Sequence, residues 1–145
     1  MSWLYNDVPF TSVEATEKIA DGYIGFVYEI LDTQNNKKYI GKKLLVTKKK
    51  LAPLKGQKRK RIKIVQTDWE TYYGSSESVK LLVEERAETF TRRILHFCKS
   101  KGELSYTEAK EQFDREVLLS DDYYNEFIGV KINSSHIKNL WKKTE

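Results

Sequence analysis

Residues 25–43 read GFVYEILDTQNNKKYIGKK, and this stretch decides the fold. Residues 26–31 are rich in β-branched and aromatic side chains, which favour a strand. Turn-forming Asp, Thr, Gln and Asn follow, and residues 38–43 return as a second strand. The pattern predicts a short β-hairpin with Tyr28 and Tyr39 near the middle of its two strands.

The two tyrosines of this hairpin are expected to meet. Side chains alternate along a strand, so Tyr39, Gly41 and Lys43 share one face of the second strand, and a hairpin can bring Tyr28 to them. Gly41 has no side chain, which weakens a strand unless a ligand or another backbone approaches closely. We therefore expect two neighbouring phenol rings beside a point of close approach.

The tripeptides Phe-Val-Tyr and Tyr-Ile-Gly, whose tyrosines are eleven residues apart, resemble the paired motifs of the GIY-YIG nuclease family. Phe26 occupies the position in which the family pattern has its leading glycine. Further along, residues 106–113 resemble the family's helix with a metal-binding glutamate, and the Tyr-Tyr-Asn at residues 123–125 resembles its terminal element. The resemblance extends over residues 25–126.

This resemblance implies an α+β fold, a small three-stranded antiparallel sheet flanked by helices. Residues 90–98 are expected to supply the third strand. A capping box from Ser105 to Glu108 is expected to open the helix that carries the metal ligand. The apolar stripe of that helix is then formed by Tyr106, Ala109, Phe113 and Val117.

The length of 145 residues predicts one domain. We expect an amino-terminal arm at residues 1–24, packed on a GIY-YIG-like nuclease domain at residues 25–145, with a basic insertion at residues 44–67. Cys98 is the only cysteine, which excludes an intrachain disulfide, and no segment resembles a signal peptide or a membrane span. The expected protein is cytoplasmic and has no membrane partner.

Positive charge is concentrated in one segment. The net charge is +5, yet residues 42–67 contain eleven Lys or Arg and no Asp or Glu, so the remainder of the chain is net acidic. A localised cationic segment beside an acidic body suits a polyanion such as DNA, although basic runs also occur in loops that bind nothing. The residues expected to contact DNA are Lys43, Lys48, Lys49, Lys50, Lys58, Arg59, Lys60 and Arg61.

The expected activity is metal-dependent hydrolysis of DNA phosphodiester bonds. Such cleavage needs a base for the attacking water, cationic donors for the phosphoryl oxygens and help for the leaving alkoxide. Tyr28 is the preferred base, with Tyr39 positioning it, although the sequence does not separate the two roles. The pKa of a free tyrosine is about 10, and adjacent lysines or a metal favour the phenolate. Glu111, on the flank of its helix, is carried over from the resemblance as the ligand of Mg²⁺ or Mn²⁺.

The catalytic lysine has two candidates. Lys42 matches the lysine that often follows the second tripeptide in the family. Strict alternation instead places Lys43 on the face of Tyr39, unless a bulge at Gly41 redirects the chain.

The family's catalytic arginine, expected about ten residues after the second tyrosine, is replaced here by Lys49. We expect Arg61, or else Arg59, to fold back and supply a guanidinium, which grips phosphate with two hydrogen bonds where lysine cannot. Asn125 is expected to orient a water or support the metal site, or to serve only as a turn residue.

The compact chain resembles free-standing, phage-type members of the family, because only some twenty residues follow the Tyr-Tyr-Asn element. A homodimer on DNA is one expected form. The alternative function is a non-catalytic nucleic-acid-binding module on the same fold, since the family's arginine and histidine pattern is missing. An RNA-directed role is a weaker alternative.

Overall fold

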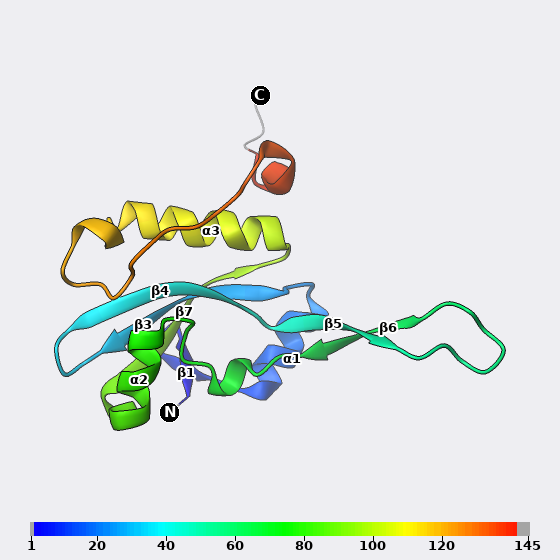
Figure 1. The fold of residues 1–145 in the computed structure, drawn as a ribbon, viewed down its shortest axis with the longest axis horizontal. Coiled ribbons are helices and arrows are strands. Elements are labelled where there is room, and N and C mark those ends of the chain that lie inside the picture. Colours follow the sequence, from blue (N-terminus) through cyan, green and yellow to red (C-terminus); the bar gives the residue numbers. More distant parts are fainter. Residues whose placement is uncertain (1, 142–145) are drawn as a thin grey trace.

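The predicted hairpin is formed by β3 (Gly25–Asp32) and β4 (Lys37–Leu44), which pair antiparallel in one continuous register (Figure 1). The structure is a computed structural model that describes residues 2–141. β7 (Phe90–Cys98) pairs antiparallel with the other edge of β3, with the bounds that the sequence predicts. These three strands are the predicted antiparallel sheet, with β3 between β7 and β4.

The sheet is larger than the three strands predicted. It has five strands in the order β2-β1-β7-β3-β4, because β1 (Trp3–Tyr5) pairs parallel with β7 and β2 (Val8–Phe10) pairs antiparallel with β1. The amino-terminal residues therefore extend the sheet. Strands of three residues are too short to show alternation in the sequence.

Helices cover both faces of the sheet (Figure 1). One face carries the main core, in which Trp3, Phe26, Tyr28 and Trp69 are almost completely buried. The opposite face packs Val27 against the longest helix. The helical elements are α1 (Ser12–Ala20), η1 (Trp69–Thr71), α2 (Glu77–Arg86), η2 (Ala87–Thr89), α3 (Lys101–Asp114), η3 (Val117–Leu119) and η4 (Ser134–Leu140).

Helix α3 begins five residues before the predicted start. Its N-cap is Ser100, whose hydroxyl accepts a hydrogen bond from the backbone N–H of Glu103 at 3.1 Å. The chain contains two Ser-x-x-Glu patterns in succession, and the first one caps the helix. Ser105 and Glu108 consequently lie inside α3, so the capping box predicted there is wrong.

The face that α3 turns toward the sheet differs in part from the prediction, since Ala109 is buried as expected but lies beside a second row of residues. Leu104 and Gln112 are buried, with Glu108 midway between them at the same helical spacing. Phe113, which was expected in the apolar stripe, is 63% exposed. Two polar residues, Glu108 and Gln112, therefore lie in the row that faces β4.

The basic insertion is a β-ribbon and not a loop. β5 (Val46–Leu51) and β6 (Arg61–Gln66) form a separate two-stranded antiparallel sheet that projects from the body (Figure 1). At its base Leu45 is fully buried and its carbonyl accepts the N–H of Thr67 at 2.9 Å. The ribbon is anchored at this base.

The segment after η3 runs beside the free edge of β4. Tyr123 forms a parallel bridge with Lys38, and the backbone of Lys38 bonds to that of Asp122 at 2.8 Å and of Tyr124 at 2.7 Å. Beyond this segment lies η4, which is capped by Asn133. In the described part of the chain, no helix has the length and apolar character that crossing a membrane requires.

Candidate active site

The two hairpin tyrosines lie side by side, as the sequence predicts. Their ring centroids are 6.3 Å apart, Tyr28 is 1% exposed, and Tyr39 is partly buried. The hydroxyl of Tyr28 lies directly over Gly41, where an added Cβ would be 2.4 Å from it. The close approach expected at Gly41 is therefore made by a phenol of the same chain.

The tyrosine environment does not lower either pKa. Burial raises the pKa of Tyr28 well above its ordinary value, and Tyr72 and Tyr39 add to the effect. Burial also raises the pKa of Tyr39, although a hydrogen bond between its hydroxyl and Ser75 at 3.1 Å opposes the rise. The ammonium groups of the lysines expected to favour the phenolates, Lys42 and Lys43, are bound by Ser105 and Asp68.

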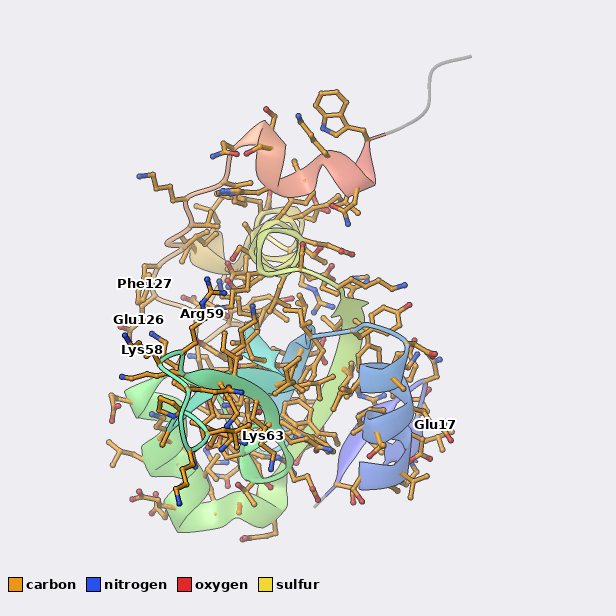
Figure 2. All side chains as sticks on the ribbon, turned by 90° about the vertical axis from the view of Figure 1, so that its right-hand side faces the viewer. Glu17, Lys58, Arg59, Lys63, Glu126 and Phe127 are labelled. Carbon is orange, nitrogen blue, oxygen red and sulfur yellow. The ribbon has the colours of Figure 1, made fainter. Side chains whose placement is uncertain are left out.

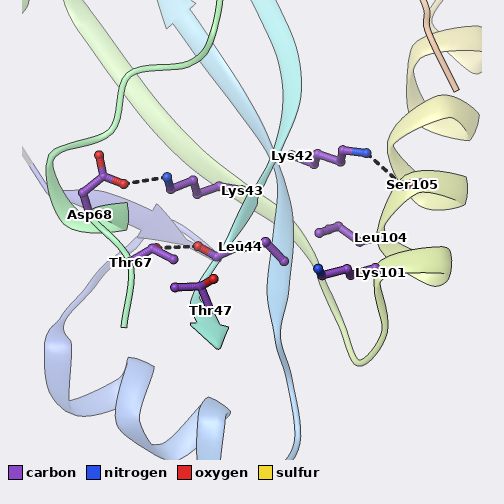
Figure 3. Close-up of a pocket in the computed structure, with 9 residues that line it drawn as sticks. All are labelled: Lys42, Lys43, Leu44, Thr47, Thr67, Asp68, Lys101, Leu104 and Ser105. Carbon is purple, nitrogen blue, oxygen red and sulfur yellow. Dashed lines mark hydrogen bonds and ion pairs between the residues drawn. The ribbon is translucent and has the colours of Figure 1, made fainter. Parts of the chain in front are cut away.

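Lys42 and Lys43 leave β4 on opposite sides (Figure 3). The ammonium of Lys43 bonds to Asp68 at 2.6 Å and lies 4.1 Å from the centre of the Tyr72 ring, so it stays on the tyrosine side. The ammonium of Lys42 donates to the hydroxyl of Ser105 on α3 at 2.8 Å. Alternation therefore holds across this strand. The irregular register lies instead between β3 and β7, at Val27.

Glu108 is the carboxylate that stands beside the tyrosines. Its side chain is 15% exposed, and the Lys42 ammonium lies 4.0 Å from it. Burial raises the pKa of Glu108, against the opposing effect of Lys42, and the charge of Glu108 acts on both Tyr28 and Tyr39. The sequence prediction missed this residue because it assigned the carboxylate to a helix cap. The spacing of Leu104, Glu108 and Gln112 was the signal that could have found it.

Glu111 lies in a different network. Its carboxylate accepts from Arg115 at 3.0 Å and contacts the His96 ring nitrogen at 3.2 Å. Arg115 also donates a hydrogen bond to the carboxylate of Glu29 at 2.7 Å. Glu29 projects from the face of β3 opposite Tyr28. The structure therefore does not bring the predicted metal ligand to the tyrosine pair.

A cavity of about 330 Å³ opens beside Tyr39. Glu108 lines it from α3, Ser75 from the segment before α2, and Asn125 from the carboxyl-terminal segment. Tyr28 is not among its lining residues. The cavity therefore joins a carboxylate, a phenol and hydroxyl groups at the free edge of the sheet.

Asn125 holds this edge together. Its side-chain amide accepts the N–H of Ile40 at 3.1 Å and donates to the carbonyl of Ile40 at 2.8 Å. Gln112 donates to the same carbonyl at 3.0 Å. The hydrogen bonds of Asn125 thus attach the carboxyl-terminal segment to β4.

The arginines of the insertion lie far from the tyrosines along the chain's projecting ribbon. Arg61 begins β6 at the far end of the ribbon, where its side chain donates to the carbonyl of Ala52 at 3.2 Å. Lys58 and Arg59 lie on the ribbon tip, which faces the viewer in Figure 2. The prediction that Arg61 or Arg59 folds back to the tyrosines is wrong in this structure, because pairing of β5 with β6 holds them outward.

A second cavity of about 550 Å³ lies between the ribbon base and the start of α3 (Figure 3). Lys42, Lys43 and Lys101 line it, with Asp68 as the acidic member. Lys42 connects the two cavities, since its ammonium lies 4.0 Å from Glu108. Cationic side chains therefore continue from the tyrosine site toward the ribbon.

The oxygen groups of the tyrosine cavity suit a divalent cation that takes few ligands from the protein. Within residues 2–141 no three His, Cys, Asp or Glu side chains cluster to form a metal site of their own. Mg²⁺ is usually held by only one or two carboxylates and completes its shell with water and substrate phosphate. Glu108 suits that role, because the Lys42 ammonium at 4.0 Å lies beyond ordinary hydrogen-bond range and a hydrogen bond with the Lys42 backbone leaves the carboxylate further acceptor capacity.

A sequence comparison decides the family. The family model described as "Putative endonuclease segE, GIY-YIG domain" matches residues 3–128. The chain belongs to the GIY-YIG endonuclease family. The GIY-YIG match includes β1 and β2 as well as the hairpin and α3, which agrees with their place in one sheet. No curated protein and no solved structure matches the chain.

Proposed function

We propose that this GIY-YIG protein is a metal-dependent DNA endonuclease whose active centre is the cavity between Tyr39 and Glu108. The observation that carries the proposal is the position of Glu108. α3 places this carboxylate at the free edge of β4, next to Lys42 and within electrostatic reach of both hairpin phenols. The metal-ligand role expected for Glu111 passes to Glu108.

Each group in the cavity has a distinct proposed role. Glu108 would hold Mg²⁺ or Mn²⁺, which when bound neutralises charge on the phosphoryl oxygens. Tyr39 lines the cavity, so its phenol is the one that would contact the attacking water or a phosphoryl oxygen. Tyr28, buried beneath it, positions the ring of Tyr39. Lys42 would supply a cationic donor in place of the family's arginine.

DNA is the proposed substrate because cationic groups extend away from this centre. Lys42 and Lys101 line the cavity at the ribbon base, and the ribbon continues the positive charge. Phosphate contacts of this kind give affinity without reading sequence. Lys43 is bound to Asp68, so we assign it to positioning and not to DNA contact.

The proposal is tested by nicking of supercoiled plasmid. We expect the wild type to nick with Mg²⁺ or Mn²⁺ and to be inactive in EDTA. Tyr39→Phe should lose about 100-fold or more in rate, because it removes the phenol that faces the cavity. Tyr5→Phe is the matched control, since Tyr5 lies on β1 and packs on Phe97. Equal rates for the two variants, or nicking in EDTA, would overturn the assignment.

A non-catalytic DNA-binding module is the second candidate. It is favoured by the buried, high-pKa phenol of Tyr28 and by the outward position of Arg59 and Arg61. Such a module would bind duplex DNA with the same ribbon yet leave plasmid intact at every Mg²⁺ or Mn²⁺ concentration. The plasmid assay therefore separates the two functions.

A further inference from the structure

The ribbon has two chemically different faces. Residues opposite each other in an antiparallel pair project to the same side, and the register pairs Lys48 with Ile64 and Lys50 with Ile62. These four residues form what we call the Lys/Ile face. The reverse face includes the pair of Lys49 with Lys63.

The Lys/Ile face exposes most of the surface of two apolar side chains. Ile62 is 63% exposed and Ile64 is 61% exposed. A free two-stranded hairpin is only marginally stable in water. Because these isoleucines are exposed, they add little core packing to stabilise it. Residues 46–66 contain nine Lys or Arg and no Asp or Glu, which makes a polyanion the complementary partner.

The Lys/Ile face is also turned toward the body of the protein. Lys48 and Ile64 line a cavity of about 480 Å³ together with Lys99 and Lys101 at the start of α3. Lys101 also lines the cavity that contains Lys42. A duplex lying against this face would therefore also meet lysines of the body that lead to the proposed active centre.

We propose that the Lys/Ile face of the ribbon enters the major groove of the DNA substrate and reads thymine. The inference rests on the proposed function for the identity of the substrate. The major groove admits a two-stranded β-ribbon and presents the thymine methyl group, which apolar side chains contact. Ile62 and Ile64 would contact such methyls, while Lys48 and Lys50 bind phosphates or base edges beside them.

The test uses the full chain with Glu108→Gln, so that binding is measured without cleavage. A preferred duplex is first selected from random DNA in EDTA, and its thymines are then replaced by deoxyuridine, which lacks only the methyl group. We expect each contacted methyl to contribute about fourfold in affinity. The loss should disappear when Ile62→Ser and Ile64→Ser are added, because the methyl partners are gone.

Lysine pairs on the two faces provide the matched comparison. Lys48→Gln with Lys50→Gln should reduce the slope of log affinity against log salt by about 1.8, the value for two lost phosphate contacts. Lys49→Gln with Lys63→Gln removes the same charge from the reverse face and should change the slope less. Circular dichroism checks that each variant keeps its fold.

Three results would overturn the inference. They are selection of no preferred duplex, a deoxyuridine effect that survives loss of both isoleucines, or a larger effect from the reverse face. Each can occur in a protein that still nicks plasmid, so it leaves the proposed nuclease function intact. Preferred binding with no cleavage by the wild type would refute the nuclease and keep the ribbon inference.

Discussion

At the scale of single residues, the Tyr28 phenol above Gly41 leaves no room for a side chain at this position. A Cβ on this residue would lie 2.4 Å from the hydroxyl oxygen and 2.6 Å from the ring of Tyr28, and Tyr28 has no free space into which to move. Gly41→Ala should therefore destabilise the fold by about 1–3 kcal/mol, the usual cost of overpacking a core, and lower nicking by displacing the tyrosine pair.

Urea unfolding with a plasmid assay measures both effects of Gly41→Ala. Gly129→Ala is the control for stability alone, because its added Cβ meets Phe127 at the ordinary distance of 3.5 Å but Gly129 lines the tyrosine cavity. Full stability of the Gly41 variant would show that Tyr28 is less firmly held than its burial implies.

The residue scale also shows what the sequence could not decide. The hairpin tyrosines were predictable from strand alternation, and their contact is confirmed. Glu108 was missed because Ser100 and Ser105 each precede a Glu by three residues, and only tertiary packing selects Ser100 as the cap. Asn125 was recognised by its motif, but its bonds to the backbone of Ile40 depend on a long-range contact that no local pattern contains.

At the scale of elements, a buried ion pair joins β3 to α2. Asp32 is fully buried, and the Arg86 guanidinium donates to both of its oxygens at 2.6 and 2.7 Å, with the Tyr124 hydroxyl adding a third bond at 2.6 Å. Burial raises the pKa of Asp32, but the hydrogen bonds from Arg86 and Tyr124 outweigh it and hold the pKa below its ordinary value.

The depressed pKa of Asp32 gives stability a defined pH dependence. The contribution is fully present above the unfolded pKa of about 3.9 and is lost as pH falls through the lower folded value. The free energy of unfolding of wild type minus that of Asp32→Asn should therefore shrink between about pH 5 and pH 2. Urea titrations at several pH values measure this difference. A constant difference would mean that the carboxylate charge contributes no stability.

The amino-terminal strands are a second element-scale test. Trp3 is 1% exposed, packs on Phe26 and Tyr28, and donates its ring N–H to the carbonyl of Trp69 at 2.7 Å. Trp3→Ala should cost about 3–5 kcal/mol of unfolding free energy, as for other large core truncations.

Val8→Ala is the control for the Trp3 substitution, because Val8 is 60% exposed and should change stability by less than about 0.5 kcal/mol. Similar small losses for both variants in urea unfolding would mean that β1 is only loosely attached.

Secondary-structure elements differ in how clearly the sequence predicts them. β7 was predicted with its observed bounds because Phe90, Thr91, Ile94 and Phe97 are strand formers within one short segment. β1 and β2 have three residues each and no local signature. The strands of the ribbon were not predicted, because the many charged residues obscured the alternation of Ile62, Lys63 and Ile64, which is a strand pattern.

At the scale of the whole molecule, the densest positive charge and the proposed active centre lie in different parts of the protein. The acidic body carries the proposed centre, whereas the ribbon projects from it with a high density of Lys and Arg (Figure 1). If about six phosphates are contacted, affinity for DNA should fall roughly 10³-fold between 50 and 200 mM salt. Replacing residues 48–64 by a short turn should flatten this dependence.

Shortening the ribbon should leave the body folded, because the ribbon pairs with itself and Leu45 anchors the chain before it starts. Fluorescence anisotropy across salt concentrations and a thermal melt measure the two effects. A steep salt dependence that survives in a folded, shortened protein would place the main DNA contacts elsewhere.

The most direct test of the account compares two glutamates one turn apart on α3. Glu108→Gln and Glu111→Gln make the same chemical change, and the rate of plasmid nicking at saturating Mg²⁺ is measured for both. The structure places only Glu108 at the tyrosine cavity, whereas Glu111 bonds to Arg115 and His96. We predict a loss of at least about 100-fold for Glu108→Gln and only a few-fold change for Glu111→Gln. The reverse order, or equal rates, would contradict the account.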